Sequence, residues 1–405
     1  MKFKEELSTV GFFYLASAFF WIAMGIMAGY WVLYYASLGL SFTIIGLIFI
    51  ANSSAMFIFE IPTGAIADIF GRKVSVGISY LTIGIAYLLV FFSGTNIFLL
   101  ILFNFIAGIG WTMESGAFEA WFIDTVKHKK KSKHLHKMLG RWGSMGNVGF
   151  IVGPFLGAIL VGFGYDKALL ATSILMLFMG LFIFIFGTES YFKKTKIHIS
   201  KDIKKTIKNT KFALKFTKDH PTTYLLTIIV FLFTLGSTLV YDAYQPHVIA
   251  MGIPAPFIGY ALSIGGLLIV LQLNWSHKIT KFLGGNKKSL IIYAIAFSLV
   301  ITSIGFIKYL PLLFITMIGY TTLYDMSGSM APAFKEISNK VIPSKVRASV
   351  LSTIAWFGAL AMIIANLIFG FLSDLTSPKI VVILGGITLL ISALLYIKLP
   401  KENKK

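Results

Sequence analysis

Acidic side chains within apolar stretches are the residues of this sequence best suited to chemistry. Glu114, Asp242 and Asp325 lie inside stretches that otherwise carry little charge, and Tyr241 and Tyr324 stand beside the two aspartates. A carboxylate in such surroundings must be paired, bind a cation or take up a proton. A ring of aromatic side chains lets it hold a lipophilic cation by charge and cation–π contact. The alternative is a neutral acid that a tyrosine hydroxyl satisfies for packing alone.

Four further acids lie nearer the ends of apolar stretches. Glu60 precedes Asp68 by two helical turns, so the two can share one face. Asp68 precedes Arg72 by about one turn, which allows an ion pair at the membrane surface. Glu119 and Asp124 follow Glu114 in the same stretch. Glu60 fits a gate residue or a transport residue equally well, and Glu119 fits a structural role as well as a functional one.

No sequence pattern supports an enzyme. The chain has no cysteine, and its seven histidines lie mainly in basic loops. Spacings typical of metal sites, nucleotide-binding loops and nucleophile elbows are missing, so we predict no cofactor and no metal. No lysine or arginine lies in the middle of an apolar stretch, which disfavours phosphate or carboxylate substrates. Buried amides are few, which disfavours sugars. With these substrate classes disfavoured, we expect a lipophilic substrate that is neutral or cationic.

Composition identifies the elements that must position these side chains. Of the 405 residues, 57% are hydrophobic, and the mean hydropathy is +0.83. The apolar stretches run for roughly 20 to 30 residues, which is long enough to cross a bilayer as helices. The net charge of +20 resides in the loops between them, so we predict a membrane protein that does not bind nucleic acid.

We predict an all-α membrane protein of twelve transmembrane helices in two six-helix bundles. Residues 1–190 form the first bundle, residues 191–220 a basic cytoplasmic linker or amphipathic helix, and residues 221–405 the second bundle. The expected spans are residues 10–33, 43–69, 74–92, 97–126, 138–163, 167–186, 221–249, 256–282, 288–306, 310–339, 345–372 and 379–399.

The lysines and arginines predict the orientation. If the N-terminus lies inside, nearly all cations of the loops fall on the cytoplasmic side, and only Lys167, Lys308 and Lys379 fall outside. This asymmetry follows the positive-inside rule and places both termini in the cytoplasm. We expect a multi-pass protein of the cell membrane.

The loop between the second and third spans carries a specific motif. Gly64, Asp68, Gly71, Arg72 and Lys73 follow the pattern G-x-x-x-D-x-x-G-R-K. The motif resembles the signature loop of the major facilitator superfamily, with Ile69 where that family usually has a cation. The resemblance implies two six-helix bundles that work by alternating access. It also implies that Asp124 pairs with Arg72 when the cytoplasmic gate is closed.

The fifth span carries a second motif, made of Gly140, Gly149, Gly153, Pro154 and Gly157. Its spacing resembles the motif that marks the antiporter branches of the same superfamily, and an ordinary packing face is the alternative.

The fourth span departs from that branch. Proton-coupled drug exporters of the family usually carry a buried arginine there, at the position of Asn104. An asparagine can orient a hydrogen bond but carries no charge, so proton coupling would have to use other groups.

The resemblance and the buried acids together predict a monomeric transporter whose partners are a small molecule, protons and the bilayer. We expect proton-coupled efflux of lipophilic or cationic molecules, with Asp242, Asp325, Glu114, Tyr241, Tyr324 and Asn104 at the substrate and proton site. Proton-coupled uptake of a small organic solute is the first alternative. A membrane receptor or scaffold that transports nothing is the second.

Overall fold

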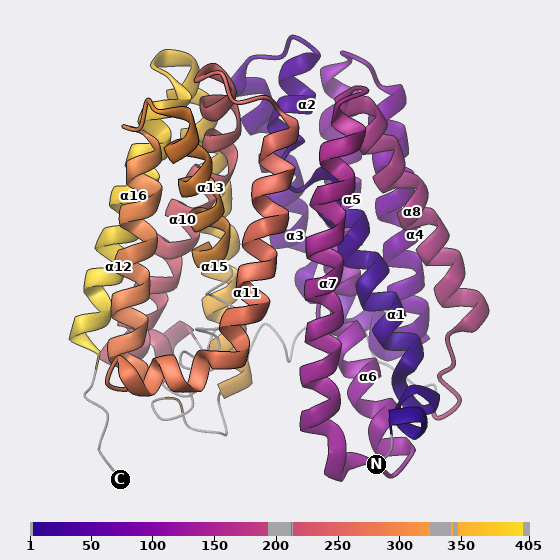
Figure 1. Cartoon of the computed structure of the whole chain (residues 1–405). Coiled ribbons are helices and arrows are strands. Elements are labelled where there is room, and N and C mark those ends of the chain that lie inside the picture. The colour runs from indigo at the N-terminus through magenta and orange to yellow at the C-terminus, as the bar shows by residue number, and fades with distance from the viewer. Residues whose placement is uncertain (1–2, 193–211, 213, 325–341, 343–346, 400–405) are drawn as a thin grey trace. The chain divides into compact units, whose positions relative to one another are not determined.

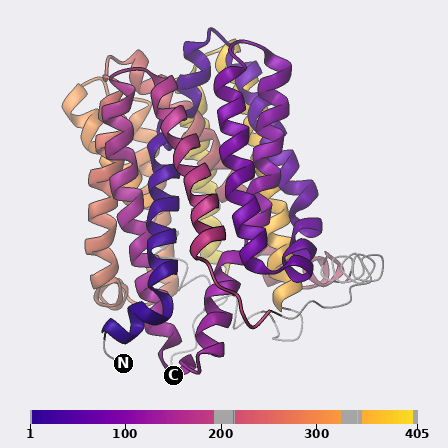
Figure 2. The same cartoon turned by 90° about the vertical axis from the view of Figure 1, so that its right-hand side faces the viewer.

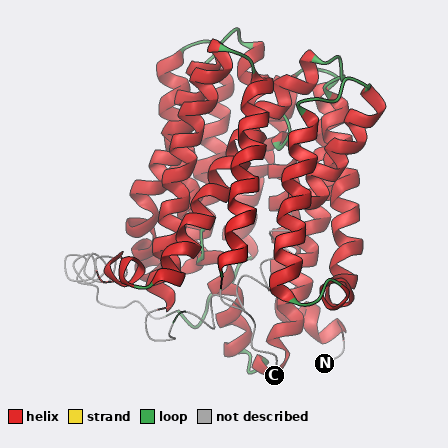
Figure 3. Ribbon diagram, turned by 90° about the vertical axis from the view of Figure 1, so that its left-hand side faces the viewer, coloured by secondary structure: helices red, strands yellow, loops and turns green. Residues whose placement is uncertain are grey.

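The chain folds into helices joined by short loops, as the computed structural model shows (Figure 1, Figure 3). The structure describes residues 3–192, 212, 214–324, 342 and 347–399, apart from some side chains within its helices. No strand occurs in these ranges. Helices are expected here, because a segment in lipid must satisfy its backbone groups internally.

The chain divides into two compact units, Met1–Gly39 with Ala51–Lys204 and Leu40–Ile50 with Lys205–Lys405. Helix α3 therefore gives its first residues to the second unit and the rest to the first. In the first half of the chain the helices are α1 (Phe3–Met27), α2 (Trp31–Ser37), α3 (Phe42–Phe70), α4 (Arg72–Phe92), α5 (Ile97–Glu114), α6 (Ala117–His128), α7 (Leu135–Val161) and α8 (Tyr165–Phe186).

The second half contains α10 (Pro221–Ala250), α11 (Pro256–Phe282), α12 (Asn286–Ile304), α13 (Leu310–Tyr324), α15 (Arg347–Leu375) and α16 (Pro378–Leu395). In the first unit α1 packs on α7 and α8, while α4 packs on α5 and α8. The indigo-to-magenta helices run alongside one another in Figure 2. In the second unit α10 packs on α15 and α16.

Ten helices of the described part are long and apolar enough to cross a membrane. Two further apolar helices, Pro256–Gln272 and Leu310–Leu323, occupy positions where the sequence predicts spans but are shorter. The multi-pass membrane fold is therefore confirmed, and the count of twelve spans stays a prediction.

Two expected spans are interrupted. The first was expected to run to residue 33, but α1 ends at Met27 and α2 begins at Trp31. The fourth was expected as one helix over residues 97–126, but α5 ends at Glu114 and α6 begins at Ala117. Gly116 separates them in a left-handed conformation with φ 70°, which glycine adopts without strain. The proposed linker falls largely outside the described residues.

Each unit has its own core. In the first unit Trp121 is fully buried and packs edge-on against Phe13 with ring centroids 4.9 Å apart. In the second unit the core joins α10, α12, α16 and the residues that follow α16, through the buried side chains of Leu226, Ile229, Leu290, Ala294, Ala393, Tyr396 and Leu399.

Candidate functional site

The turn between α3 and α4 is built around Gly71. Its φ of 97° lies in the region that favours glycine. A Cβ atom at this position would also come within 2.8 Å of the carboxylate oxygen Oε2 of Glu189. Glycine is therefore required here both for the reversal of the chain and for the approach of an acid that follows α8.

Glu189 caps the start of α4. The backbone N–H of Arg72 donates to Oε1 at 3.2 Å, and the backbone N–H of Lys73 donates to Oε2 at 2.9 Å. A carboxylate at a helix N-terminus satisfies free amide groups and complements the helix dipole. The Lys73 ammonium donates in return to the carbonyl of Phe184 at the end of α8, at 2.9 Å. Sequence reasoning missed Glu189, because nothing near it in the chain marks it.

The Arg72 side chain reaches α6. Its Nη1 donates to the carbonyl of Ala120 at 2.9 Å and forms an ion pair with Asp124. Both side chains of the pair remain about one third exposed. The structure thus brings Arg72, Lys73 and Asp124 of the expected gate motif together in the first unit, and adds Glu189.

The other expected gate residues are placed less closely. Glu119 is exposed in the first turn of α6. Glu60 is exposed on α3 and accepts a hydrogen bond from the Ser115 hydroxyl at 3.0 Å. Gly64 and Asp68 lie within α3, but their surroundings and the side chain of Asp68 fall outside the described part of the structure.

Tyr191 ties the segment after α8 to α6. Its hydroxyl donates to the carbonyl of Trp121 at 3.1 Å and lies 3.0 Å from Oγ1 of Thr125. The indole N–H of Trp121 donates to the carbonyl of Thr188 at 3.2 Å. Burial raises the pKa of Tyr191 to about 12, so the hydroxyl keeps its proton at neutral pH. These hydrogen bonds hold the segment that contains Glu189 against α6.

Glu114 is the last residue of α5 and stands at the interruption of the fourth span. It interacts electrostatically with Glu60 and with Tyr80. Tyr80 is fully buried, and its ring stacks on Phe20 with centroids 5.0 Å apart and lies 6.4 Å from Phe118. The interruption therefore sets an acid beside an aromatic cluster of the first unit.

Asn104 belongs to a buried polar network. Its amide nitrogen donates to the hydroxyl of Tyr35 and to the carbonyl of Leu100, both at 2.8 Å. The side chain of Asn52 donates to the backbone carbonyl of Asn104 at 3.0 Å. Both N–H groups of the Asn104 amide are thus engaged within the first unit.

The glycines of α7 form its contact with α1. A Cβ atom at Gly149, Gly153 or Gly157 would lie 2.2–2.6 Å from a backbone carbonyl oxygen of α1. Pro154 lies inside the helix, and its Cδ is 2.7 Å from where a Cβ of Gly25 would stand. At Gly140, the first glycine of the motif, a Cβ atom would meet nothing within 4 Å. Three of the four motif glycines therefore permit close helix packing.

Asp242 is the buried acid of the second unit. It is 4% exposed on α10, and its Oδ2 accepts no hydrogen bond from any described residue. Pro246, four residues on, has no N–H to donate to the backbone carbonyl of Asp242. Tyr241, beside it, is half-buried on the same helix. Asp325 and the side chain of Tyr324 fall outside the described residues.

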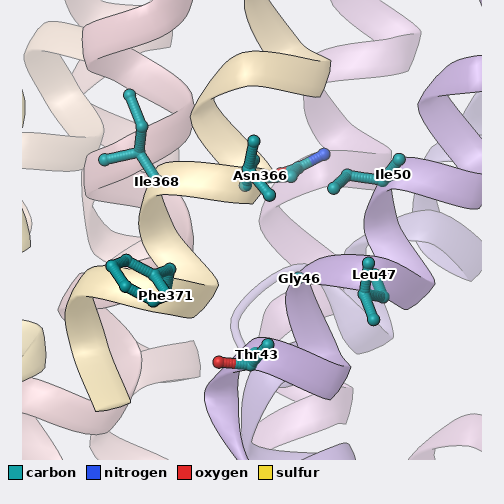
Figure 4. Close-up of a pocket in the computed structure, with 8 residues that line it drawn as sticks. Thr43, Gly46, Leu47, Ile50, Asn366, Ile368 and Phe371 are labelled. Carbon is teal, nitrogen blue, oxygen red and sulfur yellow. The ribbon is translucent and has the colours of Figure 1, made fainter. Parts of the chain in front are cut away.

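A pocket of about 340 Å³ lies within the second unit, between the first turns of α3 and the C-terminal part of α15 (Figure 4). Thr43 and Asn366 are the polar residues among those that line it. Sequence reasoning missed this pocket, because its two walls are more than 300 residues apart in the chain. Among the described residues no group of three histidine or acidic side chains could hold a metal ion.

Comparison with known proteins identifies the family of this helical bundle. The family model of the Major Facilitator Superfamily matches residues 8–324. The chain belongs to this superfamily of membrane transporters.

Two relatives are similar along most of their length. The uncharacterized MFS-type transporter YxaM of Bacillus subtilis (strain 168) is 23% identical over 389 residues, which cover 96% of this chain and 95% of the relative. The uncharacterized MFS-type transporter MJ1560 of Methanocaldococcus jannaschii is 23% identical over 87% of this chain and 88% of the relative.

Solved structures of transporters share the fold. The nucleoside transporter NupG matches with a TM-score of 0.70 at 14% identity, over 97% of this chain and 99% of that one. A D-xylose-proton symporter matches with a TM-score of 0.72 at 14% identity, over 97% of this chain and 98% of that one. At such low identity these matches speak for the fold alone.

Proposed function

We propose that this chain is a secondary active transporter that exports lipophilic or cationic small molecules in exchange for protons. The observation that carries the proposal is Asp242, a membrane-buried carboxyl group whose Oδ2 has no hydrogen-bond donor among the described residues. An ionised carboxylate in that position would be strongly disfavoured. Asp242 therefore holds a proton in this conformation.

The proton leaves Asp242 when water or a substrate cation reaches it. The missing donor at Pro246 leaves the Asp242 backbone carbonyl as a second oxygen that a cation can contact. Binding of a cation at the ionised acid and binding of a proton there exclude each other, which is the requirement for exchange. Tyr241 and, beyond the described residues, Asp325 and Tyr324 complete the proposed site.

Glu114 supplies the corresponding acid of the first unit. It ends α5 beside the buried rings of Tyr80, Phe20 and Phe118, so a lipophilic cation held by its carboxylate would lie next to an apolar, aromatic cluster. Electrostatic repulsion between Glu114 and Glu60 disfavours the state in which both acids are ionised, which favours binding of a proton or a cation there.

The charged turn acts as the cytoplasmic gate in this proposal. Arg72 links the start of α4 to Asp124 and to the Ala120 carbonyl of α6, while Glu189 fixes the turn from α8. Asp68, Glu60 and Glu119 are the further residues that we assign to the gate. Gly71 allows the turn itself, and Gly64 is a further residue of the motif within α3.

Proton-coupled uptake of a small organic solute is the second candidate. Asn104 favours it, because the amide stands where drug exporters of the family have an arginine, and its N–H groups are already bound to Tyr35 and Leu100. The likeness to a nucleoside transporter and to a xylose-proton symporter is compatible with uptake but rests on the fold alone.

The direction of the pH gradient that drives accumulation separates the two functions. Purified protein is placed in liposomes with the membrane potential clamped, and the entry of ethidium, a lipophilic cation, and of a neutral nucleoside is followed. Antiport predicts that ethidium accumulates when the lumen is acidic, and that protein-free liposomes and Asp242→Asn do not accumulate it. Accumulation of the nucleoside alone, and only with an alkaline lumen, would replace export by uptake.

A further inference from the structure

The start of α3 is held by a side chain from the far end of the sequence. The backbone N–H of Phe42 donates to Oδ1 of Asp374 at 2.9 Å, and that of Thr43 donates to Oδ2 at 2.7 Å. Asp374 lies in the last turn of α15. One carboxylate from α15 therefore serves two of the free amide groups at the N-terminus of α3.

The two helices also approach each other closely. A Cβ atom at Gly46 would lie 2.5 Å from the carbonyl oxygen of Asn366, and one at Gly370 would lie 2.8 Å from that of Phe42. Glycine on both sides lets the backbones touch just below the Asp374 contact. Because α3 gives Leu40–Ile50 to the second unit and its remaining residues to the first, this contact fixes one end of a helix that both units share.

We propose that Asp374 is a positioning residue of the transport cycle: by capping α3 it holds the outer end of that helix against α15. The charge pattern of the sequence places this end outside the cell. The contact must release whenever α3 leaves α15, so Asp374 stabilises the conformations in which the outer side is closed. The proposal rests on the transport function proposed above and on the alternating access that the family resemblance implies.

The natural absence of cysteine allows a direct test. Ile50 lines the pocket between α3 and α15 and is partly buried (Figure 4). Ile50→Cys therefore reports, through its reaction with a membrane-impermeant maleimide added outside, how often the two helices separate. The assay needs neither a substrate nor a proton gradient, so it can fail or succeed independently of the proposed export activity.

Loss of the carboxylate should speed the labelling. In the Ile50→Cys background we expect Asp374→Ala to raise the labelling rate roughly fivefold to tenfold, as loss of a helix cap implies. Asp374→Asn keeps one acceptor oxygen and should give an intermediate rate. Asp166→Ala is the matched control, because it removes an exposed acid at the start of α8 that pairs with Lys167 and does not touch α3.

A second variant keeps the test decisive if Asp374→Ala does not fold. Gly46→Ala drives a methyl group towards the Asn366 carbonyl and should raise the labelling rate as well, whereas Gly140→Ala, at a position with open space, should not. Rates that stay the same in Asp374→Ala and in Gly46→Ala, or that rise equally in Asp166→Ala, would overturn the proposal.

Discussion

At the scale of single residues, Glu189 and Arg72 make different kinds of contact at the start of α4. Glu189 accepts hydrogen bonds from two of the backbone N–H groups that the helix leaves free, and the Arg72 guanidinium reaches Ala120 and Asp124 on α6. The first interaction stabilises one helix end. The second joins two helices, which makes it the one that can respond to a conformational change.

Replacing the cap should lower stability. We expect Glu189→Gln to destabilise the protein by about 1 kcal/mol, because the neutral amide loses the charge that complements the helix N-terminus. The measurement is the melting temperature of the purified protein in detergent. The control is Asp166→Asn, which breaks an exposed ion pair with Lys167 and should leave the melting temperature nearly unchanged. Equal melting temperatures for both variants would refute the cap.

Exchanging the charges of Arg72 and Asp124 tests the ion pair of the proposed gate. Arg72→Asp and Asp124→Arg should each slow substrate transport in proteoliposomes, because each places like charges together. The double variant should recover part of the rate, and the coupling should amount to about 1 kcal/mol for a pair that is partly exposed. If the double variant lost as much transport rate as the two single variants together predict, the ion pair would have no role in the cycle.

The sequence predicts some of these residues and not others for a physical reason. Gly71, Arg72 and Lys73 stand out because a charged turn between apolar stretches has few other uses. Glu189 does not stand out, because its partners are the backbone amides of Arg72 and Lys73. Arg72 lies 117 positions earlier in the chain. A backbone amide carries no sequence signal, so such a cap becomes visible only in three dimensions. The same holds for Asp374.

At the scale of elements, the glycines of α7 decide how closely it packs on α1. We expect Gly149→Ala to destabilise the protein by roughly 1–3 kcal/mol, because its methyl group would stand 2.3 Å from the carbonyl oxygen of Ala18. Gly140→Ala, in the same helix, meets open space and should be neutral or slightly stabilising. Thermal unfolding in detergent compares the two variants. Equal stability would show that α1 and α7 do not need this close contact.

Helix positions were easier to predict from the sequence than helix interruptions. Hydropathy stays high through residues 10–33 and 97–126, so each was expected as one helix. The structure interrupts both, at the turn before Trp31 and at Ser115 and Gly116. Gly116 was the available signal, but a glycine in an apolar stretch is compatible with packing as well as with a break. The aromatic setting of Glu114 follows from that break.

At the scale of the whole molecule, the two units each place an acid within the membrane-spanning part. Glu114 stands beside aromatic rings in the first unit, and Asp242 lies buried in the second. Composition and the charged turn were sufficient to predict a membrane transporter of the Major Facilitator Superfamily, which the family match confirms. The substrate could not be predicted in the same way, because it depends on which side chains meet, and sequence spacing does not determine that.

The most direct test measures proton movement across the membrane of liposomes. Liposomes that contain the protein, a trapped pH dye and an acidic lumen receive ethidium outside, with the membrane potential clamped. We predict that the lumen becomes alkaline as ethidium enters, that Asp242→Asn abolishes this response, and that Asp166→Asn preserves it. A lumen that stays acidic with every lipophilic cation, or an Asp242→Asn variant that responds as the unmodified protein does, would contradict proton exchange at Asp242.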